Sequence, residues 1–267
     1  MLQAQALTAL ACFHMARPGP EKAQDLERAL DYLRRALSAL YSGLLSDSAS
    51  GLDDETVKDR TRVLLADVFL RRLRGDPEEN ANEILVHTDS LELQKETDPY
   101  YWALGKYLRG IAYQLRQETK LSAGAKSDKF MPFFDARAAV DFLKESLDVF
   151  TKETYPFERA AALLGWSAAI GPLVTADAPG DFKLQFAYQL AASEEIFTPL
   201  THPANWAAIQ IHRARLAQAL RGDDVEGFRS SPVEVLFRAQ AFLSRRDHPE
   251  LWGRLEQEKA RNPGGVR

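Results

Sequence analysis

The sequence contains a single cysteine, Cys12, among its 267 residues. One cysteine cannot form a disulfide within the chain, and it cannot supply a cysteine-rich zinc site or a CxxC redox pair. A reducing compartment is the expected environment for such a chain, and we predict a cytoplasmic location.

A basic excess is also absent, because 34 Lys and Arg residues stand against 38 Asp and Glu residues, for a formal net charge of −4. General nucleic-acid binders usually need a basic excess to neutralise phosphates, so nucleic-acid binding is not expected beyond a local patch. No window holds about 18 uninterrupted apolar residues, so no membrane-spanning helix is expected. No Lys or Arg precedes the apolar stretch that ends at Cys12, which argues against a signal peptide.

Strand-like alternation of apolar and polar residues is missing as well, whereas helical periodicity runs through almost the whole chain. Near the start, apolar residues recur at three- and four-residue spacing until Arg17, Pro18, Gly19 and Pro20 end the pattern: Leu2, Ala6, Ala9, Leu10, Phe13 and Ala16. The next stretch carries one broad apolar stripe: Leu26, Ala29, Leu30, Leu33, Ala36, Leu37 and Leu40. We predict an all-α fold of about ten helices.

Four segments align without gaps around a proline, at Pro99, Pro156, Pro203 and Pro249. These prolines are 57, 47 and 46 residues apart. A large apolar residue precedes each proline by six positions: Leu93, Phe150, Phe197 and Leu243. Three residues after the proline stand Trp102, Trp206 and Trp252, with Arg159 at this position in the second segment. The chain therefore contains internal repeats.

The spacing predicts what each repeat does structurally. A helix runs down to a turn, and the proline opens the next helix, where its missing N–H costs little. The tryptophans are interpreted as core residues that hold the second helix against the first, with contact to a ligand as the alternative. Small residues in the second helix permit close packing: Gly110, Ala112, Ala214 and Ala217. Because one helix pair cannot bury both faces alone, we expect stacked pairs with a continuous core.

This pattern resembles the tetratricopeptide repeat family. The resemblance rests on the runs Ala29, Leu33, Ala36, Leu37 and Ala139, Leu143, Ser146, Leu147, and on Trp102, Gly110, Ala112 and Tyr113 in the helix after the proline. The Trp-Ala pair after the proline is similar to longer bacterial repeats found with CHAT-type peptidases and signalling domains. The departures are the long periods and two loops, predicted at residues 46–55 and 117–129.

The resemblance implies antiparallel helix pairs stacked in a right-handed superhelical solenoid. We expect a single helical-repeat domain over residues 1–267, with about five helix pairs and a disordered tail at residues 259–267. The family also implies that the helix after each proline lines the concave groove.

The candidate partner-binding residues are cationic. Four lie on these helices, Lys106, Arg109, Arg213 and Arg215, and two lie on the predicted helix from Lys58 to Arg74, Arg60 and Arg62. Arg109 and Arg213 each follow a repeat tryptophan by seven residues, so they could line one surface and bind peptide carboxylates. The alternative is a solvated face with ion pairs inside single helices, which contribute little to stability.

No convincing catalytic or metal-binding constellation is present. The run from Gly165 to Ala169 lacks the final glycine of a nucleophile elbow, and the run from Ala123 to Ser127 lacks the paired glycines of a phosphate-binding loop. The five histidines form no pair at four-residue spacing. We therefore predict no enzyme activity, no metal, no cofactor and no small-molecule substrate.

Two functions remain from this reasoning. The first is a noncatalytic scaffold or adaptor that binds a peptide or protein partner in its groove, in a bacterial regulatory or signalling assembly. The second is a regulatory or substrate-recruiting subunit of an enzyme complex, such as a CHAT-type protease system. A nucleic-acid-binding helical repeat is a weaker third hypothesis.

Overall fold

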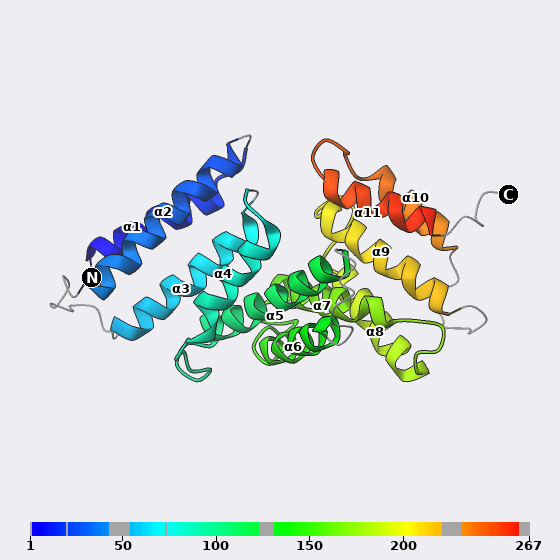
Figure 1. The fold of residues 1–267 in the computed structure, drawn as a ribbon, viewed down its shortest axis with the longest axis horizontal. Coiled ribbons are helices and arrows are strands. Elements are labelled where there is room, and N and C mark those ends of the chain that lie inside the picture. The colour runs from blue at the N-terminus through cyan, green and yellow to red at the C-terminus, as the bar shows by residue number, and fades with distance from the viewer. Residues whose placement is uncertain are drawn as a thin grey trace. The chain divides into compact units, whose positions relative to one another are not determined.

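The computed structural model describes residues 2–19, 21–42, 54–72, 74–122, 131–220 and 231–261. Within these ranges the chain forms eleven α-helices and one short 3-10 helix, and it forms no strand (Figure 1). The prediction of an all-α fold is therefore confirmed. The part of the chain that is described contains no helix long and apolar enough to cross a bilayer.

The chain divides into two compact units, Met1–Val149 and Phe150–Arg267. The first unit contains α1 (Leu2–Ala16), α2 (Lys22–Tyr41), α3 (Asp54–Arg71), α4 (Pro77–Asp89), α5 (Pro99–Ser122) and α6 (Met131–Leu147). The second contains α7 (Pro156–Ile170), η1 (Gly171–Leu173), α8 (Gly180–Glu194), α9 (Pro203–Ala219), α10 (Pro232–Ala241) and α11 (Pro249–Ala260).

Helix ends differ from the sequence-based expectation in three places. Residues 117–122, predicted to lie in a loop, form the last turns of α5. Residues 259 and 260 of the predicted tail end α11, whereas residues 262–267 lie outside the described ranges. Of the other predicted loop, residues 54 and 55 begin α3 and the rest lies outside the described residues.

Helices that are consecutive in the sequence pack against each other in the first unit, and α3 also packs against α5. Their inward faces form a core that contains Phe69, which is only 2% exposed, together with fully buried leucines and an isoleucine: Leu33, Leu65, Leu108 and Ile84. Such burial contributes about 1.5–3 kcal/mol for each large apolar side chain. This core positions α4 and α5, which carry the candidate site.

In the second unit α9 is the central helix, because it packs against α8 and α10 and also contacts α7 and α11. Its buried residues include Trp206 and Ile211, which pack with Leu236 of α10 and Leu255 of α11. Because α9 packs against several helices, its apolar residues lie on several sides of the helix rather than in one stripe.

The four aligned prolines each begin a helix, as the spacing predicts. The turns before the four prolines contain the same backbone hydrogen bond. The N–H of the residue before proline donates to the carbonyl oxygen four residues earlier, at 2.9–3.1 Å, in all four segments: Asp98 to Gln94, Tyr155 to Thr151, His202 to Thr198 and His248 to Ser244. We call this turn the proline corner.

Backbone angles agree among the proline corners as well. Tyr155, His202 and His248 have φ of −139°, −140° and −134°, with ψ of 65°, 65° and 57°. Their carbonyl oxygens accept the N–H three residues after the proline, at 2.9–3.0 Å. The proline lacks an N–H, so it leaves no donor unsatisfied at the first helical position. The repeat alignment therefore corresponds to one recurring backbone structure.

Gly110 lies where α5 packs against α6, and a larger residue there should destabilise the first unit. A Cβ atom at Gly110 would lie 2.6 Å from Leu143 Cγ and 3.1 Å from the carbonyl oxygen of Ala139. Gly110→Ala should lower the free energy of unfolding by about 1–2 kcal/mol, because overpacking exceeds the gain in helix propensity. Urea unfolding measures this change.

Gly253 in α11 provides the matched control, because a Cβ atom there would meet no atom within 4 Å. Gly253→Ala should raise stability by about 0.5–1 kcal/mol through helix propensity alone. If Gly110→Ala were as stable as the unmodified protein, α5 and α6 would be packed more loosely than described.

Candidate functional site

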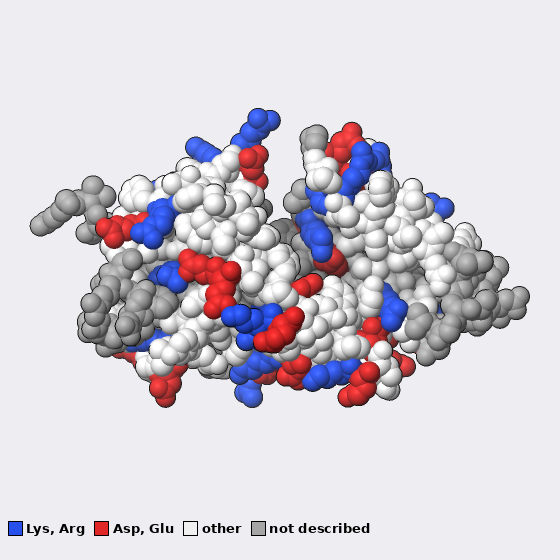
Figure 2. Space-filling model, turned by 180° about the vertical axis from the view of Figure 1, so that it is seen from behind, with Lys and Arg blue, Asp and Glu red and all other residues white. Residues whose placement is uncertain are grey.

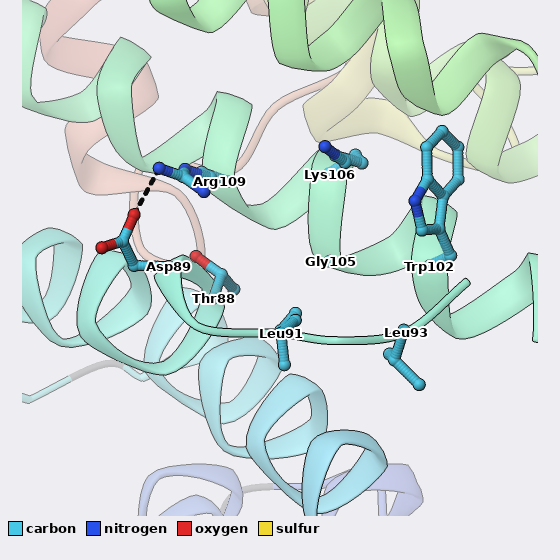
Figure 3. A pocket seen from close by; sticks show the side chains of 8 residues that line it. All are labelled: Thr88, Asp89, Leu91, Leu93, Trp102, Gly105, Lys106 and Arg109. Atoms are coloured by element: carbon cyan, nitrogen blue, oxygen red, sulfur yellow. Dashed lines mark hydrogen bonds and ion pairs between the residues drawn. The ribbon is translucent and has the colours of Figure 1, made fainter. Parts of the chain in front are cut away.

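A pocket of about 230 Å³ lies in the first unit, between the end of α4, the segment that follows it, and α5 (Figure 3). Lys106 and Arg109 project from α5 on one side, and Leu91 and Leu93 lie on the segment across from them. The pocket therefore has cationic groups on one side, and Leu91 and Leu93 with the polar residues Thr88 and Asp89 on the other. Its lining consists of Thr88, Asp89, Leu91, Leu93, Trp102, Gly105, Lys106 and Arg109.

Arg109 is held by two contacts. Its Nη2 is ion-paired with Asp89, the last residue of α4, and its guanidinium carbon lies 4.4 Å from the ring centroid of Phe142. Its Nε is buried and has no hydrogen-bond partner among the described residues. The side chain is 22% exposed, so the guanidinium is positioned by the fold and still reaches solvent.

Trp102 forms the aromatic wall of the pocket. Lys106 Nζ and Lys95 Nζ each lie 5.4 Å from a Trp102 ring centroid. Lys106 also pairs with Glu145 of α6 at 2.6 Å, and its side chain is 29% exposed. Cations over an aromatic face are attracted by about 0.5–2 kcal/mol, so Trp102 helps to hold both ammonium groups near the pocket.

Gly105 lies at the middle of the pocket on α5, between Trp102 and Arg109. A Cβ atom there would lie 2.8 Å from Leu91 Cδ1. The absence of a side chain at Gly105 therefore lets Leu91 pack directly onto α5 and gives the pocket its width.

Two other predicted cations, Arg60 and Arg62, lie on α3 and bind acidic groups of the same unit. Arg60 Nε donates to Asp98 Oδ2 at 2.6 Å. Arg62 Nη1 pairs with Asp59 Oδ1 at 3.2 Å and donates to the carbonyl oxygen of Ser90 at 3.3 Å. Arg60 thus ties α3 to the proline corner before α5.

The remaining predicted cations, Arg213 and Arg215, lie on α9 in the second unit. Arg213 Nη2 pairs with Glu194 Oε2 at 2.5 Å, and Arg215 Nη2 pairs with Glu258 Oε1 at 2.6 Å. Glu258 is only 3% exposed, and its charge is compensated by Arg215 together with Arg261, whose Nη1 lies 2.8 Å from the same oxygen. Of the six predicted cations, only Lys106 and Arg109 line the pocket.

A recurring contact explains why cations follow the repeat tryptophans by seven residues. At three proline corners this residue reaches back to the end of the preceding helix: Arg109 to Asp89, Arg213 to Glu194 and Lys259 to Gln240. Most of the predicted cations therefore join different helices, whereas the alternative interpretation placed the pairs within single helices. This contact orients the cation whether or not a partner binds it.

The three repeat tryptophans differ in their surroundings. Trp206 is 5% exposed, donates from Nε1 to Glu194 Oε1 at 3.1 Å, and meets Phe242 edge-on at 5.3 Å. Trp252 is half-buried and packs against the same core. Trp102, also half-buried, lines the pocket.

His212 on α9 is a buried polar residue that the sequence does not single out. Its side chain is deeply buried, and its Nδ1 has no hydrogen-bond partner among the described residues. Burial, with a smaller contribution from Arg215 and Arg254, lowers the pKa of His212 to about 3. The ring also meets Phe186 edge-on at 6.0 Å. His212 is therefore a neutral core residue at physiological pH.

Charge is mixed on one face of the molecule. On the face drawn in Figure 2, basic and acidic side chains lie next to each other without a large area of one sign. Groups of three or more metal-ligating side chains are absent from the part of the chain that is described. No family model, curated protein or solved structure matches this chain.

Proposed function

We propose that this chain is a noncatalytic binding module of helical repeats that takes an acidic peptide segment of a partner protein at the Trp102 pocket. The observation that carries the proposal is the placement of Trp102, Lys106 and Arg109 around one opening of about 230 Å³. Drug-sized ligand sites usually occupy about 300–1,000 Å³, so this opening suits one side chain better than a cofactor.

The pocket chemistry favours an acidic residue with an apolar neighbour. Arg109 and Lys106 present donors to a carboxylate, and Leu91 and Leu93 can cover the apolar part of the ligand. Glu145, the partner of Lys106, is 44% exposed, and such exposed pairs contribute about 0–1 kcal/mol. An incoming carboxylate can therefore share the three donors of the Lys106 ammonium at low cost.

The wider proposal is a tetratricopeptide-like adaptor in which the helix pairs stack as a right-handed superhelix. Support comes from the proline corner, which recurs four times with the same hydrogen bonds. We further propose that the adaptor works in the cytoplasm, in a bacterial regulatory or signalling assembly. Both ideas rest on the resemblance of the repeats.

A peptide array of varied sequence, probed with the purified chain, tests the proposal. We expect enrichment of peptides with Asp or Glu beside an aliphatic or aromatic residue. Lys106→Gln should weaken binding of the enriched peptides about tenfold or more, because it removes a charge-assisted hydrogen bond. Titration calorimetry measures the change in Kd.

Lys152→Gln is the matched control, because Lys152 also pairs with a glutamate, Glu195, at 2.7 Å but lies in the second unit. This variant should bind the peptides like the unmodified chain. An array without acidic preference, or equal binding by Lys106→Gln, would overturn the proposal.

A further inference from the structure

Helix α1 has two apolar faces, of which only one is covered. The inward face is buried against the rest of the first unit and consists of Ala4, Leu7, Ala11 and Met15. The opposite face is exposed and consists of Ala6, Ala9, Leu10 and Phe13, with Leu10 45% and Phe13 60% exposed. We call this second set the outer face of α1. It includes most of the apolar stripe that the sequence shows before Arg17.

The outer face carries no charge, since residues 2–16 contain no Asp, Glu, Lys or Arg. A helix face with large apolar residues and no charge is normally covered by another surface. Large exposed apolar residues on an uncharged helix therefore indicate a surface that another helix covers.

A surface that covers the outer face of α1 should itself carry no charge. Exposed residues of α11 include Arg254 and Glu256, and placing them on the outer face would desolvate these charges. Burying the outer face of α1 would desolvate no charged residue. A second copy of α1 presents the same uncharged apolar face.

The order of large and small residues is also self-complementary. In an antiparallel pairing centred between Ala9 and Leu10, Phe13 of one copy faces Ala6 of the other, and Leu10 faces Ala9. Each large side chain then meets a small one, which permits close approach of the two helices. We propose that two copies of this chain pair through the outer face of α1 across a two-fold axis.

The pairing should be concentration-dependent. A 15-residue helix is about 22 Å long, so one helix pair buries much less than the roughly 800 Å² per partner of a stable interface. Sedimentation equilibrium should show the weight-average mass rising from 29.9 kDa towards twice that value as the protein concentration increases from micromolar to millimolar.

Substitutions test whether the two copies associate through the outer face of α1 or through another surface. Phe13→Glu should keep the protein monomeric over the same range, with unchanged helix content by circular dichroism, because Phe13 is exposed in the single chain. Val86→Glu, at a residue of α4 that is 67% exposed, is the control and should leave the association unchanged. A monomeric unmodified chain at all concentrations, or association that survives Phe13→Glu, would overturn the pairing.

The single cysteine of the chain allows a test of the register. In the double variant Cys12→Ser/Ala9→Cys, oxidation should link two copies, because the two introduced thiols lie next to the two-fold axis. The variant Cys12→Ser/Val86→Cys should give no such link under the same conditions. Equal cross-linking of both variants would contradict the register. The outcome is independent of the Trp102 pocket, which lies on α4 and α5.

Discussion

Phe197→Ala should destabilise the second unit by about 3–5 kcal/mol, which is the largest effect we expect from a single substitution. Phe197 is fully buried and packs edge-on against Phe157, with ring centroids 5.3 Å apart. Its ring also meets His202 at 5.3 Å, within the same proline corner. Truncation would remove these contacts and leave a cavity beneath the turn.

Urea unfolding of the full chain, followed by circular dichroism, measures this loss. Phe237→Ala is the matched control, because Phe237 is 51% exposed, and it should cost about 1 kcal/mol or less. Phe150 holds the equivalent position six residues before Pro156 and is also fully buried, so Phe150→Ala should resemble Phe197→Ala. If Phe197→Ala lowered the free energy of unfolding by less than about 1 kcal/mol, the proline corner would not depend on this ring.

Acid should destabilise the second unit through His212. The pKa of this buried histidine is about 3 in the folded chain, against an ordinary value near 6.5 after unfolding. Below pH 6.5 the unfolded chain binds a proton that the folded chain does not, so stability falls as the pH decreases from about 6.5 to 3. At pH 5 the loss from this group is about 2 kcal/mol.

The free energy of unfolding at pH 7 and pH 5 tests this contribution by comparison with His212→Leu. The variant should lose about 2 kcal/mol less than the unmodified chain between these pH values, since leucine does not titrate. His248→Gln, at the less buried position before Pro249, should keep the full dependence. Equal pH dependence in His212→Leu would show that His212 is protonated without cost.

The helices were predictable because two independent signals agree at their ends. Apolar periodicity marks their length, and the prolines mark where α5, α7, α9 and α11 begin. Helix α1 shows what periodicity alone cannot predict. Both of its faces are apolar, so a stripe such as Leu10 and Phe13 identifies a helix without telling which face is buried. Only packing against α2 decides that Leu7 and Met15 point inward.

The candidate site was predictable in part, for a similar reason. Repeat position singles out Trp102 and Arg109, because both recur at equivalent places after the prolines. Asp89 and Leu91 could not be found in this way, since they reach the pocket only when the segment after α4 folds across α5. His212 was missed because an isolated histidine in a helix gives no signal of its burial.

The proline corner also bears on how fast the chain folds. Its hydrogen bonds join residues only four positions apart, so each turn can form before distant parts of the chain meet. Proteins dominated by such local contacts have low contact order and fold quickly. In repeat proteins folding can start in any unit and spread to its neighbours. Each of the four corners is therefore a local turn that needs no distant contact for its hydrogen bonds.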